Sequence, residues 1–164
     1  MSLVKLRVFA TLMPTDQQRR EQRASLSGTL FLQIGETFFP SFEWHDLTSC
    51  VLARWVIQSL SVTSSSAEIV HDFMDGPYRF GLQHDFTSHR TTCRLYEQFG
   101  EKSAEEIIDF PRYLASLRGA AKGILNEACA MRMENRKDFD DLQSGLKQIV
   151  SLENAIRMSR FQRG

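Results

Sequence analysis

Apolar and polar residues alternate along the first part of the chain. In residues 3–12 every second side chain is apolar, a period of two that predicts a β-strand. The alternation returns in residues 28–34, Gly35-Glu36 supplies a turn, and residues 37–39 can pair back, which predicts a hairpin. Residues 14–27 carry charged side chains and no aromatic or β-branched apolar residue, so we predict a polar loop or a short frayed helix there.

A helical repeat begins after Asp46. Apolar side chains recur there at spacings of three and four residues, which predicts a helix over residues 47–61 with its N-cap at or near Asp46. Four large apolar side chains of this helix should be buried against a sheet: Val51, Leu52, Trp55 and Leu60.

Shorter strands follow the first helix. A strand-like run at residues 68–74, the turn residues Asp75-Gly76-Pro77 and renewed alternation over residues 78–83 predict a second hairpin. A turn at residues 84–90 then leads into a strand over residues 92–99.

The apolar period lengthens again towards the end of the chain. Asp109 followed by Pro111 is typical of a helix cap with proline in the first turn, and it predicts a helix over residues 110–131. A second stripe predicts a last helix over residues 139–158 and leaves residues 159–164 as a frayed tail. Glycines inside these helical patterns indicate close helix contacts: Gly119, Gly123 and Gly145.

Residues 105–108 allow two interpretations. The capping-box pattern Ser103-x-x-Glu106 favours an early helical turn, whereas the Glu-Ile-Ile run is compatible with an edge strand. We expect the strand.

The order of these elements defines the fold class. Strands, one helix, further strands and then two helices are typical of α+β proteins. We expect an antiparallel sheet of about five or six strands, with one helix between hairpins and two C-terminal helices. The length of 164 residues fits a single α+β domain over residues 1–164.

Charge and hydropathy limit the partners of the chain. Lys and Arg number 20 and are balanced by 20 Asp and Glu, so no bulk positive potential is present to hold a nucleic-acid backbone. Apolar runs fall far short of the roughly 20 residues that span a bilayer, and the N-terminus lacks a signal-peptide core. We therefore expect a cytoplasmic protein with neither nucleic acid nor a membrane as its partner.

Cysteine and histidine spacing gives no sign of a metal centre. The three cysteines are an odd number without a C-x-x-C pair, which indicates neither a disulfide framework nor a zinc knuckle. His84 and His89 in the predicted turn, with His71 and Cys93 on neighbouring strands, match no regular zinc spacing. We expect no metal and no cofactor.

The densest group of unusual residues lies in two segments. Four aromatic and two acidic residues crowd positions 38–46, and positions 73–78 add two aromatic residues and an acid. Such residues can plug the entry to a helix as a hydrophobic staple, or they can form a surface with aromatic anchors and an acidic rim for a basic protein partner. The residues that would contact such a partner are Glu43, Trp44, His45, Asp75 and Tyr78.

His45 also offers a catalytic alternative. A histidine base oriented by Asp46 or Asp75 would suit a small hydrolase or transferase. The chain contains no G-x-S-x-G, phosphate-loop, G-x-G-x-x-G or H-E-x-x-H motif, however. The sequence therefore favours a non-enzymatic protein, and we assign no catalytic residue.

The two aromatic segments also carry a resemblance. Gly35-Glu36-Thr37-Phe38-Phe39-Pro40 with Trp44-His45-Asp46, and Phe73-Met74-Asp75-Gly76-Pro77-Tyr78, resemble a pattern in small uncharacterised bacterial proteins. Some of these are similar to immunity proteins encoded beside polymorphic or contact-dependent toxins. The resemblance covers residues 28–98, and Phe-Met-Asp-Gly-Pro is its most specific part. It implies a small cytoplasmic α+β protein without catalytic machinery that occludes a toxin-like partner.

The last helix predicts self-association. Leu152 and Met158 fall outside its main apolar stripe, Phe161 lies beyond it, and the zero formal net charge adds little repulsion between copies. We expect a homodimer in which this helix contributes to a two-fold interface. The alternative is a monomer in which the last helix completes the core.

Overall fold

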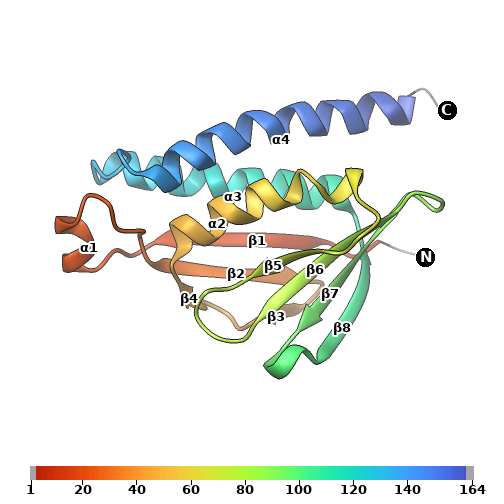
Figure 1. Ribbon diagram of the computed structural model, residues 1–164, viewed down its shortest axis with the longest axis horizontal. Coiled ribbons are helices and arrows are strands. Elements are labelled where there is room, and N and C mark those ends of the chain that lie inside the picture. Colours follow the sequence, from red (N-terminus) through yellow and green to blue (C-terminus); the bar gives the residue numbers. More distant parts are fainter. Residues whose placement is uncertain (1–2, 162–164) are drawn as a thin grey trace.

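The computed structural model describes residues 3–161 and combines four α-helices with two antiparallel sheets (Figure 1). The first sheet consists of β1 (Leu6–Leu12), β2 (Gly28–Ile34), β3 (Thr37–Phe39) and β4 (His45–Asp46). The second sheet consists of β5 (Ile69–Asp72), β6 (Arg79–Asp85), β7 (Arg90–Tyr96) and β8 (Lys102–Ile108). The helices are α1 (Asp16–Arg20), α2 (Thr48–Ser59), α3 (Phe110–Ala130) and α4 (Lys137–Phe161), with 3₁₀ turns at Val62–Ser64 and Gln98–Gly100.

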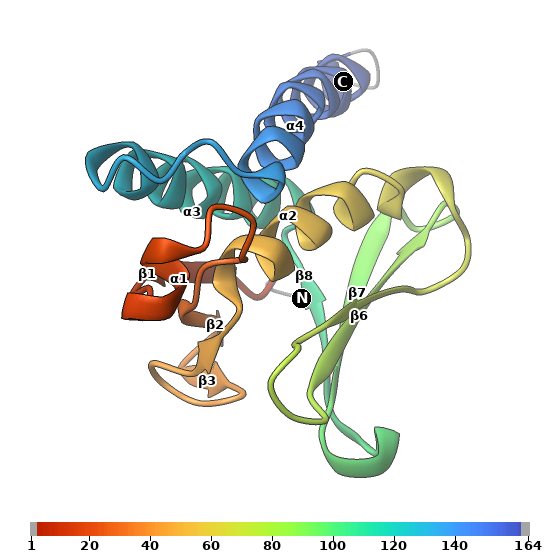
Figure 2. The ribbon, with the colours of Figure 1, turned by 60° about the vertical axis from the view of Figure 1, so that its left-hand side comes forward.

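The α+β class is confirmed, but the expectation of one sheet of five or six strands is wrong. Within residues 3–161 eight strands form two sheets of four, and one parallel bridge between Val4 and Ile108 links them. The amide of Val4 donates to the carbonyl of Ile107 over 2.9 Å. Figure 2 shows the two sheets diverging away from the helices.

The sheets are separate because a helix covers the free edge of β1. The amide of Val8 donates to Oγ of Ser116 over 2.9 Å, and the amide of Leu12 donates to Oε2 of Glu127 over 2.6 Å. These α3 side chains accept the amide hydrogen bonds that the carbonyl groups of a neighbouring strand would otherwise accept. Natural proteins commonly protect an edge strand by covering it in this way.

The core lies between the helices and the inner faces of both sheets. Trp55 of α2 is fully buried, and its indole Nε1 donates to the carbonyl of Asp72 over 2.9 Å. Its ring packs edge-on against Phe73 and Phe80 of the second-sheet region, with centroids 4.8 and 4.9 Å away. α2 therefore joins the two sheets, while α4 lies outermost and packs on α2 and α3 (Figure 1).

The sequence-based expectations for α2 hold in part. Val51, Leu52 and Trp55 are fully buried, whereas Leu60 follows the end of the helix and is half-buried. Asp46 is not the N-cap, because that position belongs to Leu47, which makes no side-chain capping bond.

The polar loop or short frayed helix predicted at residues 14–27 has defined structure. It contains α1, where Thr15 and Gln18 form a capping box. Arg136 is buried, and its guanidinium donates to the carbonyl oxygens of Gln18, Glu21 and Ala24 over 2.5–2.9 Å. These hydrogen bonds fasten the segment to the start of α4, a partner that local composition does not reveal.

The C-terminal helices agree closely with the predictions. Asp109 caps α3 by accepting the amide of Arg112 over 3.3 Å, with proline in the first turn, and residues 105–108 belong to strand β8. α4 extends to Phe161, so the predicted frayed tail is helical at residues 159–161, and residues 162–164 lie outside the described residues. Over residues 3–161 none of the helices combines the length and apolar character that a bilayer span requires.

Only one of the three helix glycines meets a close neighbour. A Cβ added at Gly145 of α4 would overlap Val56 of α2, so this glycine permits the helices to approach each other. Gly119 and Gly123 have open space where a Cβ would stand, so the predicted helix contact is wrong for these two.

A buried polar chain crosses the core. Oγ of Ser59 lies 3.0 Å from both Nε2 of His71 and the hydroxyl of Tyr113, and Nδ1 of His71 lies 3.1 Å from the carbonyl of Ile69. Because a carbonyl only accepts, Nδ1 carries the proton and Nε2 accepts from Ser59, which in turn accepts from Tyr113. Ser59 and His71 have the geometry of a nucleophile and base, but all three side chains are completely buried.

The neutral His71 makes stability depend on pH. Burial lowers its pKa to about 3 from an ordinary value of 6.5. Between these values the unfolded chain binds a proton that the folded chain does not, so stability is full above pH 6.5 and falls as the pH is lowered towards 3. We expect this residue alone to remove about 3 kcal/mol of the free energy of unfolding between pH 7 and pH 4.

Urea melts of the protein and of His71→Gln at both pH values test this prediction. The variant should be the less stable protein at pH 7, and the difference should shrink by about 3 kcal/mol at pH 4, since glutamine does not titrate. Parallel pH profiles of the two proteins would contradict the assignment.

Candidate functional site

The two aromatic segments singled out in the sequence meet through Asp46. Its carboxylate is almost completely buried, at 4% exposure. Oδ1 accepts the amide of Leu47 over 2.7 Å, and Oδ2 accepts the amides of Met74 and Asp75 over 3.0 and 3.4 Å. The residue therefore fixes the loop between β5 and β6 against the end of the first sheet.

Aromatic contacts complete this junction. The rings of Trp44 and Tyr78 meet edge to face at 5.1 Å, and Tyr78 also contacts Phe39 at 5.9 Å. Gly76 between them has a φ of 97° and lies so close that a Cβ would stand 3.1 Å from Tyr78 and 3.3 Å from Trp44. Only glycine combines this backbone conformation with so little space.

All five sequence-predicted contact residues lie at this junction. Glu43, His45 and Asp75 are exposed, and Trp44 and Tyr78 are half-buried. Glu43 has a φ of 55°, a left-handed conformation that non-glycine residues adopt at a cost and that is found often at functional sites. Their role in binding a partner stays a prediction.

The structure adds an aromatic surface that the sequence analysis missed. Four rings contact one another on the outer face of the first sheet, away from the helices, and we call them the phenylalanine surface: Phe9, Phe31, Phe38 and Phe42. Phe31 lies at the centre, with the other three ring centroids 5.0–5.8 Å away. Phe9, Phe38 and Phe42 expose 38%, 39% and 60% of their area to solvent.

The two-residue alternation along β1 and β2 explains how this surface arises. Phe9 and Phe31 are direct cross-strand partners and occupy the positions of β1 and β2 where the alternation places polar residues. Two phenylalanines at positions of the alternation that face away from the core could have revealed this surface. The sequence analysis considered only the core-facing residues of these two strands, so it did not identify the exposed aromatic pair.

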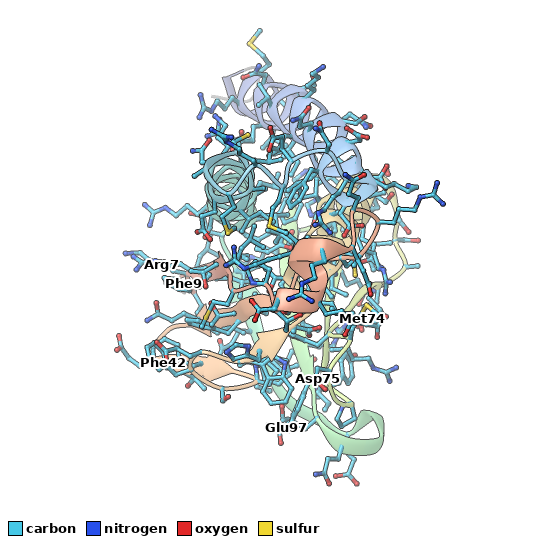
Figure 3. All side chains as sticks on the ribbon, turned by 90° about the vertical axis from the view of Figure 1, so that its left-hand side faces the viewer. Arg7, Phe9, Phe42, Met74, Asp75 and Glu97 are labelled. Carbon is cyan, nitrogen blue, oxygen red and sulfur yellow. The ribbon has the colours of Figure 1, made fainter. Side chains whose placement is uncertain are left out.

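Charged residues border the aromatic rings. Arg7 is exposed on the same strand face as Phe9, and Glu43 directly follows Phe42. Figure 3 looks onto this end of the molecule, with Arg7, Phe9 and Phe42 on one side and Met74 and Asp75 on the other. An apolar centre with a charged rim is the usual anatomy of a protein interface.

The catalytic alternative also finds its residues close together. His45, Asp46 and Asp75 line a hollow of about 370 Å³ together with Ser27, Leu47 and Met74. Both oxygens of Asp46 accept backbone amides, and within the described residues His45 makes no hydrogen bond to Asp46 or Asp75. The geometry thus contains no base oriented by a carboxylate.

The residues weighed for a metal site are dispersed. His71 and Cys93 are buried in the core, whereas His84 and His89 lie near the β6–β7 turn with ring centroids 6.5 Å apart. Among residues 3–161 no group of three or more His, Cys, Asp or Glu side chains is arranged to hold a metal ion.

Comparisons with protein-family models, with curated proteins and with solved structures gave no match for this chain. The interpretation of the surface therefore depends on its own chemistry.

The hydrogen bonds of Asp46 should make it essential for the junction. Asp46→Asn keeps the size of the side chain but replaces one acceptor oxygen with an amide that faces backbone donors. We expect it to lower the free energy of unfolding by about 2 to 3 kcal/mol and to speed amide exchange at Met74 and Asp75. The matched control Asp72→Asn removes an equal charge from an exposed nearby position and should change stability by less than about 0.5 kcal/mol. Equal effects of the two variants in urea melts would contradict the role of Asp46.

Proposed function

We propose that this protein is a non-enzymatic binding module of the immunity type, which occludes a toxin-like protein partner. The phenylalanine surface carries the proposal. Soluble monomers rarely leave large contiguous apolar patches in water, and such patches mark interaction sites. Aromatic rings are also among the side chains that contribute most binding energy at protein interfaces.

The position of the surface connects it to the resemblance. Phe38 belongs to the first of the two segments that carry the resemblance, Phe42 lies in the gap between its two parts, and Trp44 and Tyr78 hold that segment against the second. The segments with the family pattern are thus the ones that shape this end of the molecule.

Charge indicates the chemistry of the partner. Glu43 is exposed directly after Phe42, so a partner with a basic residue beside an apolar pocket would fit that side. Arg7 lies at the side of Phe9 and would meet an acidic group. Opposite charges at the two sides would fix the orientation of the partner.

A hydrolase or transferase centred on His45 is the alternative function. The hydrogen bonding of Asp46 argues against it as the orienting carboxylate, which leaves Asp75 as the candidate. Turnover of a defined small substrate that is lost in His45→Gln and Asp75→Asn would favour this alternative.

The binding proposal predicts that a neighbouring gene encodes a toxin-like protein, and this protein is the partner to test. Co-expression should restore growth, and the purified pair should form a complex whose affinity is measured by calorimetry. Replacing one exposed anchor, in Phe42→Ser or Phe38→Ser, should weaken binding by roughly 30-fold, as for an interface residue worth about 2 kcal/mol.

The control for this experiment is Ile57→Ser. Ile57 lies on α2 and is 49% exposed, so it removes a comparable apolar surface elsewhere. A control variant that binds as weakly as Phe42→Ser, or the lack of any toxin-like neighbour, would overturn the proposal.

Self-association stays a separate prediction. Val150 and Met158 of α4 are 38% and 62% exposed, and Figure 2 shows α4 projecting from the body of the protein. We expect light scattering to give twice the monomer mass of 18.9 kDa, and a chain ending at Met158 to give a lower mass. A constant mass near 18.9 kDa on concentration would show a monomer.

A further inference from the structure

A second cavity lies away from the phenylalanine surface and shares no residue with it. Its volume is about 530 Å³, within the range of roughly 300 to 1,000 Å³ that small-molecule sites occupy. The walls come from the β6–β7 turn, the end of β8, the start of α3 and the C-terminal part of α4. Segments far apart in the sequence therefore converge on one concave site.

One part of the wall is apolar. Ile108 and Phe110 form its buried base, and Ile156 of α4 is half-buried beside them. Phe86 and Leu3 also line the cavity, although they expose 47% and 45% of their area to solvent. A ligand with an apolar body would cover this exposed apolar surface, a favourable change in water.

Another part of the wall offers hydrogen-bond donors and a positive charge. Nδ1 of His84 lies 3.0 Å from Oγ1 of Thr91, which leaves Nε2 as the ring nitrogen for a ligand. Arg90 lines the cavity and makes no ion pair with a described residue. His89, next to it, lines the cavity as well.

The one carboxylate in the wall is already neutralised. Oδ1 of Asp109 accepts the amide of Arg112 over 3.3 Å, and its Oδ2 lies 3.2 Å from Nε of the same arginine. The Asp109 charge is therefore compensated at the start of α3. Arg90 leaves the cavity with an excess of positive charge, which favours an anion.

We propose that this cavity binds a small organic anion with an apolar body, a carboxylate of medium chain length. The carboxylate group pairs with the guanidinium of Arg90 and accepts a hydrogen bond from Nε2 of His84. The apolar body lies along Phe86, Phe110 and Ile156. This site is independent of the protein-binding surface and of its proposed function.

Burial, followed by the charge of His89, lowers the pKa of His84, so its ring is neutral at pH 7. A carboxylate bound at Nε2 would select the tautomer in which Nδ1 accepts from the hydroxyl of Thr91 and Nε2 carries the proton.

An NMR titration of the full chain with octanoate tests the proposal. Octanoate should bind saturably, with amide shifts concentrated in residues 84–91 and 107–111. Octanol and octylammonium, which have the same chain and a different head group, should bind more weakly by about tenfold or more. Arg90→Gln should weaken octanoate binding by a similar factor.

Arg23→Gln is the matched control, because it removes the same charge from an exposed position that does not line the cavity. It should bind octanoate like the unaltered protein. Absence of saturable binding, equal affinity for the three head groups, or an equal loss in Arg23→Gln would overturn the proposal. None of these results depends on whether the phenylalanine surface binds a protein.

Discussion

A single buried carboxylate, that of Asp46, links the two sheets at the aromatic end of the molecule. Burial of a charge is unfavourable unless hydrogen bonds replace its water, and three backbone amides do so for Asp46. Two of these amides come from the loop between β5 and β6 of the second sheet, and the third comes from the entry to α2. The arrangement of Trp44 against Tyr78, and with it the aromatic end of the protein, depends on this link.

The two faces of the first sheet have different surroundings. Its inner face supplies the core under α2 and α3, whereas its outer face displays the phenylalanine surface to solvent. Antiparallel sheets usually have a polar outer face, and this departure is the observation from which the proposed binding function is argued. Function is thereby separated in space: the outer face of one sheet suits a macromolecule, and the cavity near the β6–β7 turn suits a small anion.

The sequence correctly predicted those features that depend on residues close together in the chain. Asp109 and the proline after it sufficed to place α3, because a cap acts within one helical turn. The helix cap expected at or near Asp46 is Leu47, and the side chain of Asp46 instead finds donors 28 and 29 positions away. The division into two sheets and the anchoring of residues 14–27 by Arg136 also escaped prediction, because both depend on contacts more than 100 residues apart. Five predicted surface residues did come together, yet Phe9 and Phe31 were missed although the alternation contained them.

The cover of β1 by α3 has a consequence for synthesis. A ribosome completes the strands of the first sheet well before it adds Ser116 and Glu127, which bind the edge of β1. During that interval the nascent hairpin presents an open edge and an uncovered apolar face, the two features that promote strand addition between chains. A chaperone bound to the emerging first half would cover these features, and rapid translation through residues 110–130 would shorten the interval.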